Sequence, residues 1–332
     1  MRILNNVQYL RGIAALLVCG FHTQNWISNV YGYNLGKFLF GKGDDGVELF
    51  FIISGFIMVY TTKNMNLEIP YKNIKEFLKK RAIRIMPLYT ILTMFWIWIF
   101  IPDFSYNYVN VIKIIKSIFF IPYDKFPILY LGWTLNYEMF FYLVFAASFC
   151  FKRYRYYALT LFFLLQFGLQ FFEFNDIRLQ FVNAPIVSYF FSGVLIGLLV
   201  DKVKIKYYKS YLIGAWVLLV LYFLDFIQIN NQYLQFLFLS IVVFMIVLGD
   251  FYLELVPFNV LLFLGNISYS IYLIHPFVSG FVLMNFISWE DISMEYRVVF
   301  YMLLILLTIL ISYILYILVE QKLTRMLKKL IS

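Results

Sequence analysis

The chain has 332 residues, of which 63% are hydrophobic and 14% charged, and its mean hydropathy is +0.81. A soluble domain has roughly 45–50% apolar and about 25% charged residues, so this composition excludes a water-soluble protein. The 27 Lys and Arg residues against 18 Asp and Glu give a net charge of +9. In a membrane protein such an excess indicates cytoplasmic loops, and no nucleic-acid partner is needed to explain it.

Ten apolar runs, each near the roughly 20 residues that a membrane-spanning helix needs, follow one another along the chain. They cover residues 7–28, 45–62, 83–101, 130–150, 156–172, 184–200, 210–227, 231–249, 258–283 and 298–319. The stretch 103–128 carries Lys113 and Lys116 within an apolar pattern, which is typical of a loop with an interfacial helix. We therefore expect an all-α integral membrane protein with about ten transmembrane helices.

The basic residues predict how these spans are oriented. If the amino terminus is cytoplasmic, 19 of the 27 Lys and Arg residues fall on the inner side and 7 on the outer side. This bias predicts that both termini are cytoplasmic. We expect a single domain over residues 1–332, with spans and loops over about 7–319, a basic cytoplasmic tail over 320–332 and no fused soluble domain.

Few ionisable residues lie inside the apolar runs. A charge at mid-bilayer costs at least roughly 2.5–3.5 kcal/mol, so each such residue is a functional candidate. Away from the ends of the runs, they are Arg11, His22, Glu48, Glu138 and His275. In the predicted orientation Arg11 belongs to the cytoplasmic boundary. The other four fall at outer or middle depth, where they could meet.

His22 is the candidate general base, because an imidazole titrates near neutrality. A carboxylate bonded to one ring nitrogen would orient the other, and Glu48 is the first candidate for that partner. A histidine in a membrane span is also often an interhelical hydrogen-bonding residue. Spacing alone leaves both interpretations open.

A basic segment leads into the third apolar run, on the predicted inner side. Its Arg81 and Arg84 are three residues apart, so they share a helix face and present two guanidinium groups that suit phosphate oxygens. Anchoring to lipid headgroups is the alternative explanation for this segment. Together with His22 on another span, the pair indicates a phosphate-bearing donor held at the inner face and a base placed deeper.

Several short blocks carry distinctive residues in a fixed order over residues 9–276. They are Arg11 followed by His22, GVELFFIISGF from Gly46 to Phe56, Arg81-x-x-Arg84-x-x-Pro87, Trp133-Thr134-Leu135 with Glu138, Phe141-Tyr142, Gly193 with Gly197, and LGNISYSIYLIHP from Leu264 to Pro276. Together they resemble the membrane acyltransferase 3 family, most closely its exopolysaccharide O-acetyltransferases. Glu48 stands where many relatives have Asp, a change that keeps the carboxylate.

The resemblance implies an integral O-acyltransferase of the bacterial inner (plasma) membrane. Such an enzyme takes an acetyl or another short acyl group from cytoplasmic acyl-CoA, with acetyl-CoA as the expected donor substrate, to a hydroxyl of a cell-surface polysaccharide or its lipid-linked precursor. It implies that Arg11, Arg81 and Arg84 bind acyl-CoA. His22 acts as base or as transient acyl acceptor. Further implied residues are Glu48 and Glu138 as catalytic candidates, and Trp133, Tyr269 and His275 as support for the site or the acceptor route.

Two other classes remain as alternatives. One is a transporter that moves an acyl donor, a proton or a glycan without chemistry, and the other is a structural subunit of polysaccharide assembly. The Arg81 and Arg84 pair, with His22 on a separate span, favours an enzyme, because a proton-coupled transporter has less use for a phosphate-binding fork. The expected partners are acyl-CoA, a glycan or lipid-linked glycan acceptor, membrane lipids and polysaccharide-assembly proteins. No permanently bound cofactor and no metal site are expected.

Overall fold

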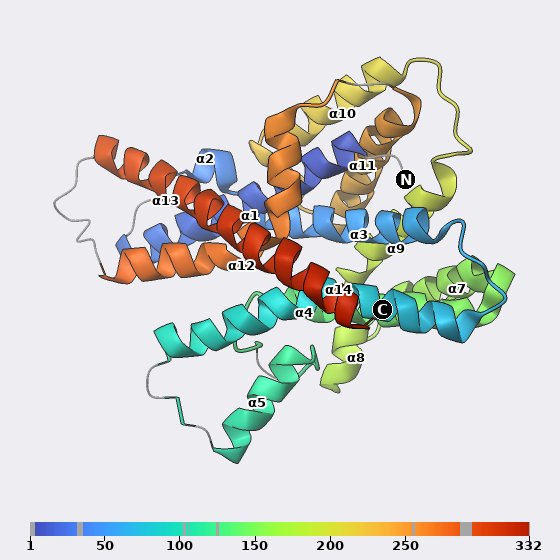
Figure 1. Cartoon of the computed structure of the whole chain (residues 1–332). Helices are drawn as coiled ribbons and strands as arrows, with labels where there is room; N and C mark the ends of the chain where they lie inside the picture. Colours follow the sequence, from blue (N-terminus) through green and yellow to red (C-terminus); the bar gives the residue numbers. More distant parts are fainter. Residues whose placement is uncertain are drawn as a thin grey trace. The chain divides into compact units, whose positions relative to one another are not determined.

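The computed structural model describes residues 4–31, 36–101, 104–105, 107–123, 126–253, 256–285 and 294–331. All regular secondary structure in these residues is helical (Figure 1). The helices are α1 (Asn5–Tyr31), α2 (Lys37–Phe40), η1 (Gly43–Asp45), α3 (Gly46–Thr62), α4 (Pro70–Phe100), α5 (Tyr108–Ile118), α6 (Gly132–Ala147), η2 (Ser148–Tyr154), α7 (Arg155–Leu169), α8 (Ile177–Val182), α9 (Val187–Leu199), α10 (Tyr208–Phe223), α11 (Gln232–Tyr252), α12 (Asn259–Asn285), α13 (Met294–Leu315), η4 (Tyr316–Leu323) and α14 (Thr324–Ile331).

Each of the ten predicted apolar runs overlaps a helix, so the all-α class is confirmed. Within the described residues, seven helical stretches are long and apolar enough to cross a membrane. They are Lys37–Thr62, Pro70–Phe100, Gly132–Leu169, Ile177–Leu199, Gln232–Tyr252, Asn259–Val282 and Tyr296–Lys329, and α10 is a shorter apolar helix. Helix α1 is not among the seven, because polar residues such as Gln8, Arg11 and His22 lower its hydropathy. The count of ten spans stays a prediction.

One of the seven stretches, Gly132–Leu169, contains two of the predicted runs. Its 38 residues would extend about 57 Å as one straight helix, twice the roughly 30 Å of a bilayer core. Lys152 breaks the helix, with φ 48° and ψ −122°, between α6 and α7. A left-handed φ at a residue with a side chain is uncommon and ends helical geometry. The break therefore allows two spans here.

Helix α4 begins at Pro70, well before the predicted start of the third run near residue 83. Pro70 occupies the first turn, where its fixed φ favours a helix and its missing N–H costs nothing. The residues that follow include four Lys residues as well as Glu76, Leu78 and Ala82, all good helix formers. The predicted start of this run near residue 83 is therefore wrong for the helix, and the basic segment before it is the first part of a 31-residue helix.

The predicted interfacial helix corresponds to α5, which begins after Asn107. The Asn107 side chain accepts a hydrogen bond from the backbone N–H of Asn110 at 2.9 Å, which is an N-terminal cap. Tyr108, Val109 and Ile115 are exposed on this short helix. Its position at a membrane surface stays a prediction.

The chain divides into two compact units, each described here by itself. The first comprises residues 1–53 and 195–316, and the second comprises 54–194 and 317–332. The predicted single domain over 1–332 stays a prediction.

In the first unit, α1 and α12 pack closely and run in the same direction. A Cβ atom on Gly12 would lie 2.8 Å from the backbone nitrogen of Gly265, and further along both helices the hydroxyls of Thr23 and Ser279 are 2.7 Å apart. Between the Gly12–Gly265 contact and the Thr23–Ser279 contact, both chains advance toward their carboxyl ends, so the helices are parallel. Parallel helices enter a membrane from the same side, as expected for the first and ninth runs.

At one end of this unit, the start of α1 contacts the end of α11. The Asp250 carboxylate accepts hydrogen bonds from the backbone N–H groups of Asn6 at 2.9 Å and Val7 at 3.0 Å. A carboxylate at a helix N-terminus is stabilised by the helix dipole and by the free N–H groups. At the same end, the ring of Tyr208 at the start of α10 stacks on Tyr252, with centroids 4.4 Å apart.

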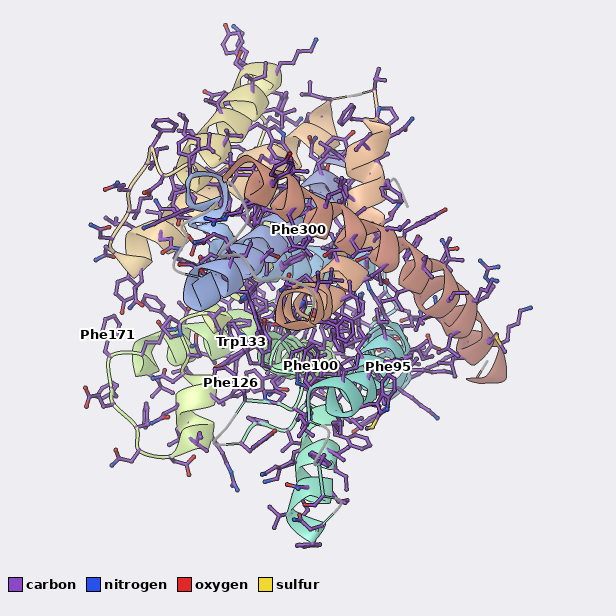
Figure 2. All side chains as sticks on the ribbon, turned by 90° about the vertical axis from the view of Figure 1, so that its left-hand side faces the viewer. Phe95, Phe100, Phe126, Trp133, Phe171 and Phe300 are labelled. Carbon is purple, nitrogen blue, oxygen red and sulfur yellow. The ribbon has the colours of Figure 1, made fainter. Side chains whose placement is uncertain are left out.

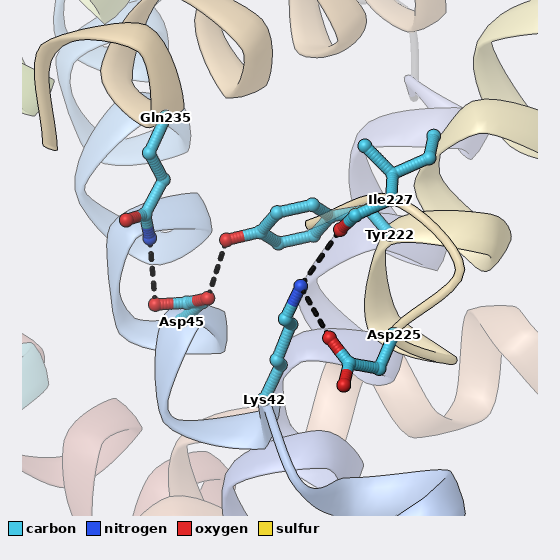
Figure 3. A network of polar contacts seen from close by, with 6 residues as sticks. All are labelled: Lys42, Asp45, Tyr222, Asp225, Ile227 and Gln235. Carbon is cyan, nitrogen blue, oxygen red and sulfur yellow. Dashed lines mark hydrogen bonds and ion pairs between the residues drawn. The ribbon is translucent and has the colours of Figure 1, made fainter. Parts of the chain in front are cut away.

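The opposite end of the first unit is tied by the polar network in Figure 3. Lys42 forms an ion pair of 2.7 Å with Asp225, and its ammonium lies 4.7 Å from the centre of the Tyr222 ring. Asp45 accepts hydrogen bonds from the hydroxyl of Tyr222 at 2.6 Å and from Gln235 at 2.7 Å. Lys42 and Asp45 thus join the segment before α3 to α10, α11 and the turn between them.

In the second unit, α4 and α6 are antiparallel. Phe77 near the start of α4 packs on Phe145 late in α6, with ring centroids 5.6 Å apart. Tyr89, further along α4, lies against Gly132 at the start of α6, where a Cβ atom would be 2.1 Å from the tyrosine oxygen. Helices α3 and α9 also approach closely, since a Cβ on Gly55 would meet the backbone oxygen of Phe190 at 2.1 Å.

The outward faces of the long helices are largely apolar. Figure 2 shows carbon predominating among the side chains drawn around the ribbon, and Phe95 and Phe171, labelled there, are 50% and 68% exposed. Leu306 and Leu310 are likewise exposed on α13. Soluble monomers rarely expose apolar patches of this extent, whereas lipid covers them in a membrane.

Candidate active site

His22 and His275 lie in contact within the first unit. Each is ten residues after a glycine of the α1–α12 contact, Gly12 and Gly265 respectively. Ten residues advance about 15 Å along either helix, so the parallel packing brings the two histidines to the same level. Their ring centroids are 5.2 Å apart, and the ring planes are inclined by 19° in a stacked arrangement. Two of the residues predicted to fall at similar depth therefore meet.

The two imidazoles have different surroundings. His275 is fully buried, and its Nδ1 is 3.3 Å from the backbone oxygen of Ile271, one turn earlier in α12. Because a carbonyl oxygen only accepts hydrogen bonds, Nδ1 is the protonated nitrogen. His22 is half-buried, and the ring of Phe21 meets it edge-on at 5.4 Å. His22 is thus the more accessible member of the pair.

Glu48 is in the first turn of α3, close to α1. The two glycines just before it press against the backbone of α1: a Cβ atom on Gly43 would lie 2.2 Å from the backbone oxygen of Leu17, and one on Gly46 would lie 2.8 Å from that of Ala14. The Glu48 Oε2 atom is buried, and no residue of the described part of the chain forms a hydrogen bond with it. The start of α3 therefore lies one to two turns before His22 along α1. The proposed Glu48–His22 hydrogen bond stays a prediction.

Arg11 lies on α1, three turns before His22. Its guanidinium donates a hydrogen bond of 3.2 Å to the side chain of Gln8, and the arginine is half-buried. It lies toward the Asp250 end of the helix, and its depth in the membrane stays a prediction. The structure thus separates Arg11 from the histidine pair by about 16 Å of helix rise.

The two arginines of α4 differ in environment, although the sequence predicts that they share a face. The Arg81 guanidinium lies over the ring of Phe77, 5.4 Å from its centre, and over the ring of Tyr142, 5.5 Å from its centre. Such cation–π contacts hold a guanidinium in a fixed plane. Arg84 is exposed, so it is the more accessible of the two. Both belong to the second unit.

Glu138 is linked to Arg81 through Tyr142. One oxygen of the Glu138 carboxylate accepts a short hydrogen bond from the hydroxyl of Tyr142 and another, of 3.3 Å, from the hydroxyl of Ser54. Tyr142 is only 3% exposed, and its ring carries the Arg81 guanidinium. Ser54 of α3, Arg81 of α4, and Glu138 and Tyr142 of α6 thus form a cluster. All four residues belong to the second unit.

Sequence reasoning missed Tyr142 and Ser54 as members of this cluster. Both stand within the motif blocks, in Phe141-Tyr142 and in GVELFFIISGF. The spacing of Glu138 and Tyr142, four residues apart on one helix, was the available signal, because such pairs face each other. The contact with Ser54 has no such local signal, since it joins residues 84 positions apart.

The remaining candidates occupy separate places. Trp133 is half-buried at the start of α6 and meets Tyr137 edge-on, with ring centroids 6.1 Å apart. Tyr269 is half-buried on α12, six residues before His275. Among the described residues, no group of three or more His, Cys, Asp and Glu side chains is arranged to hold a metal ion.

Comparisons with known proteins point to one family. The model of an acyltransferase domain family, acyltransferase 3, matches residues 4–317. The exopolysaccharide production protein ExoZ of Rhizobium meliloti (strain 1021) is 32% identical over 167 residues, which cover 48% of this chain and 51% of that protein. The chain thus aligns with about half the length of this relative. No solved structure matches this chain.

Proposed function

We propose that this chain, which belongs to the acyltransferase family matched over residues 4–317, is an inner-membrane O-acetyltransferase that uses cytoplasmic acetyl-CoA. Its acceptor in this proposal is a hydroxyl of an exopolysaccharide or of its lipid-linked precursor. The name of the partly aligned relative, an exopolysaccharide production protein, supports this acceptor class. The observation that carries the proposal is the contact between His22 and His275 on two parallel helices.

The reaction needs an unprotonated nitrogen on His22. In the proposed step His22 removes the proton of the acceptor hydroxyl while its oxygen bonds to the acyl carbon. The carbon–sulfur bond then breaks, and the CoA thiolate takes up the proton that His22 removed. Formation of an acyl group on His22 itself is the second route, and it uses the same nitrogen as nucleophile.

The donor site in this proposal is built around Arg81 and Arg84. Guanidinium groups suit the phosphates of CoA, because their fork of donors matches phosphate oxygens. Tyr142 and Phe77 hold the Arg81 guanidinium, while the exposed Arg84 is available to a ligand in solution. Arg11 is the third proposed contact to the donor. Glu138 and Glu48 are the carboxylates proposed to assist.

The proposed topology has ten spans with both termini in the cytoplasm. The excess of Lys and Arg on one side supports it. The alternating directions of α10 and α11 agree with it, since Tyr208 stacks on Tyr252 at one end and Asp45 bonds both Tyr222 and Gln235 at the other. The position of the donor arginines in the first half of α4 then corresponds to the cytoplasmic side, where acyl-CoA is available.

A doubly labelled donor separates an enzyme from a transporter. Purified protein in proteoliposomes receives acetyl-CoA that carries one label on the acetyl group and another on the CoA moiety, together with an oligosaccharide acceptor. Transfer predicts that the acetyl label becomes covalently bound to the oligosaccharide while the CoA label stays in free CoA. If both labels accumulate together inside the vesicles and no acceptor is modified, the protein is a transporter and the proposal is wrong.

A further inference from the structure

The Nε2 atom of His275 is a buried hydrogen-bond acceptor that the proposed reaction leaves unused. Its ring is fully buried, and no residue in the described ranges forms a hydrogen bond with Nε2. Since Nδ1 donates to the backbone oxygen of Ile271, the neutral ring presents its lone pair at Nε2. Buried polar atoms of native proteins nearly always have a hydrogen-bond partner, and a substrate that reaches His22 can supply one here.

The stacked arrangement keeps this lone pair available beside His22. The two ring centroids are 5.2 Å apart and the planes are inclined by 19°, and no nitrogen of His22 forms a hydrogen bond with Nε2 of His275. His22 therefore does not occupy this lone pair. Because His22 is half-buried and His275 fully buried, a substrate that engages His22 stands next to His275.

The chemistry of the two substrates decides which one binds Nε2. The reacting end of an acyl thioester has a carbonyl oxygen and a sulfur, neither of which donates a hydrogen bond. The reacting hydroxyl has a single hydrogen, which goes to His22 in the proposed function. A sugar offers a second hydroxyl on the adjacent carbon, and this group is a donor at about one hydrogen-bond length from the first.

We propose that His275 Nε2 accepts a hydrogen bond from the hydroxyl adjacent to the one that is acylated. The pair of histidines then recognises a vicinal diol, with His22 on the reacting oxygen and His275 on its neighbour. This inference rests on the proposed function and extends it, since it makes His275 a determinant of which sugar hydroxyl is modified. The backbone bond of Nδ1 holds the His275 ring in the orientation that this role requires.

The test compares two acceptors and two variants of His275. The acceptors are an oligosaccharide that the wild-type protein acetylates and the same compound with the hydroxyl next to the acetylated one replaced by hydrogen. In His275→Asn, the side-chain amide nitrogen takes the place of Nδ1 and keeps the bond to Ile271, but no atom replaces Nε2. In His275→Gln, the end of the side chain reaches the place of Nε2 and restores an acceptor there.

For the wild type we expect kcat/KM to fall at least about tenfold when the adjacent hydroxyl is removed, the loss that follows from one unmade buried hydrogen bond. We expect His275→Asn to lower kcat/KM for the complete acceptor by a similar factor. For the deoxy acceptor, kcat/KM of His275→Asn should be close to that of the wild type, because both changes remove the same contact. His275→Gln should recover part of the discrimination. The KM for acetyl-CoA, which should stay unchanged, verifies that each variant is folded.

Equal kcat/KM of the wild type for both acceptors overturns the proposal without using any variant. The proposal is also overturned if His275→Asn lowers kcat/KM for the deoxy acceptor by the same factor as for the complete acceptor. In that case His275 has a structural role or binds a water molecule. In both cases the transferase activity itself stands. A wild-type protein that acetylates no acceptor refutes the proposed function instead.

Discussion

The rings of His22 and His275 stack at 5.2 Å because Gly12 and Gly265 let the backbones of α1 and α12 approach ten residues earlier. The spacing from Gly12 to His22 on α1 equals the spacing from Gly265 to His275 on α12, and the helices are parallel. The close contact at the glycines therefore places the two histidines at the same level. The position of the catalytic candidates thus depends on two residues that carry no chemistry. This dependence can be tested by adding a single methyl group at either glycine.

We expect Gly265→Ala to destabilise the protein and to reduce acyl transfer. The new Cβ would lie 2.3 Å from the backbone oxygen of Gln8, so α12 must move away from α1 at a cost of about 1–3 kcal/mol. Gly214→Ala on α10 is the matched control, because its Cβ meets no atom within 4 Å and alanine favours a helix over glycine. Thermal unfolding followed by light scattering in detergent should show a lower midpoint for Gly265→Ala only. A Gly265→Ala protein as stable and active as wild type would contradict the proposed role of this contact.

We expect Arg81→Ala and Arg84→Ala to raise the KM for acetyl-CoA about tenfold or more, and to leave the KM for the oligosaccharide nearly unchanged. Each loses charge-assisted hydrogen bonds to phosphate, which are worth about 1.5–3 kcal/mol. Arg178→Ala on α8 serves as a control for loss of one positive charge. Steady-state kinetics with each substrate varied in turn gives both constants. An increase only in the KM for the oligosaccharide would mean that these arginines belong to the acceptor site instead.

We expect Tyr142→Phe to weaken the donor site less than Arg81→Ala does. The phenylalanine ring keeps the surface on which the Arg81 guanidinium lies, but the hydroxyl that donates to Glu138 is lost. The KM for acetyl-CoA should rise only a few-fold, because the lost hydrogen bond acts on the donor site indirectly, through Glu138, and Ser54 still donates to the same carboxylate. Tyr207→Phe, at an exposed position, is the control. No change in Tyr142→Phe would mean that the cluster only packs helices α4 and α6.

Orientation in the membrane can be tested with introduced cysteines. In a protein whose exposed Cys150 is first replaced by serine, we expect Lys72→Cys to resist an impermeant thiol reagent in intact cells and Gln228→Cys to react. Both positions are exposed, so access differs only by the side of the membrane. Labelling after permeabilisation shows that the Lys72→Cys thiol is reactive. Reaction of Lys72→Cys in intact cells would reverse the topology.

The sequence predicts the helices of this protein well, because a run of about 20 apolar residues is a strong signal that does not depend on tertiary contacts. It does not predict where α4 begins. The residues after Pro70 are charged, yet good helix formers, so composition indicates a loop where propensity extends the helix.

The contacts of the candidate residues are harder to predict. Depth along a span indicates that His22 and His275 could meet, but the order of helices around a bundle is set by packing between distant segments. The link from Ser54 to Glu138 is likewise long-range and leaves no periodic pattern in the sequence. The pairing of Glu48 with His22 remains a prediction for the same reason.

The most direct test of the account is the rate of acetyl transfer from acetyl-CoA to an oligosaccharide acceptor in proteoliposomes, measured for the wild type and for His22→Ala. Asn25→Ala, one turn further along α1, controls for substitution in this helix. Removal of a general base or nucleophile predicts a loss of at least about 10²-fold in kcat for His22→Ala, with the KM for acetyl-CoA little changed and Asn25→Ala close to wild type. Transfer by His22→Ala at the wild-type rate would contradict the account.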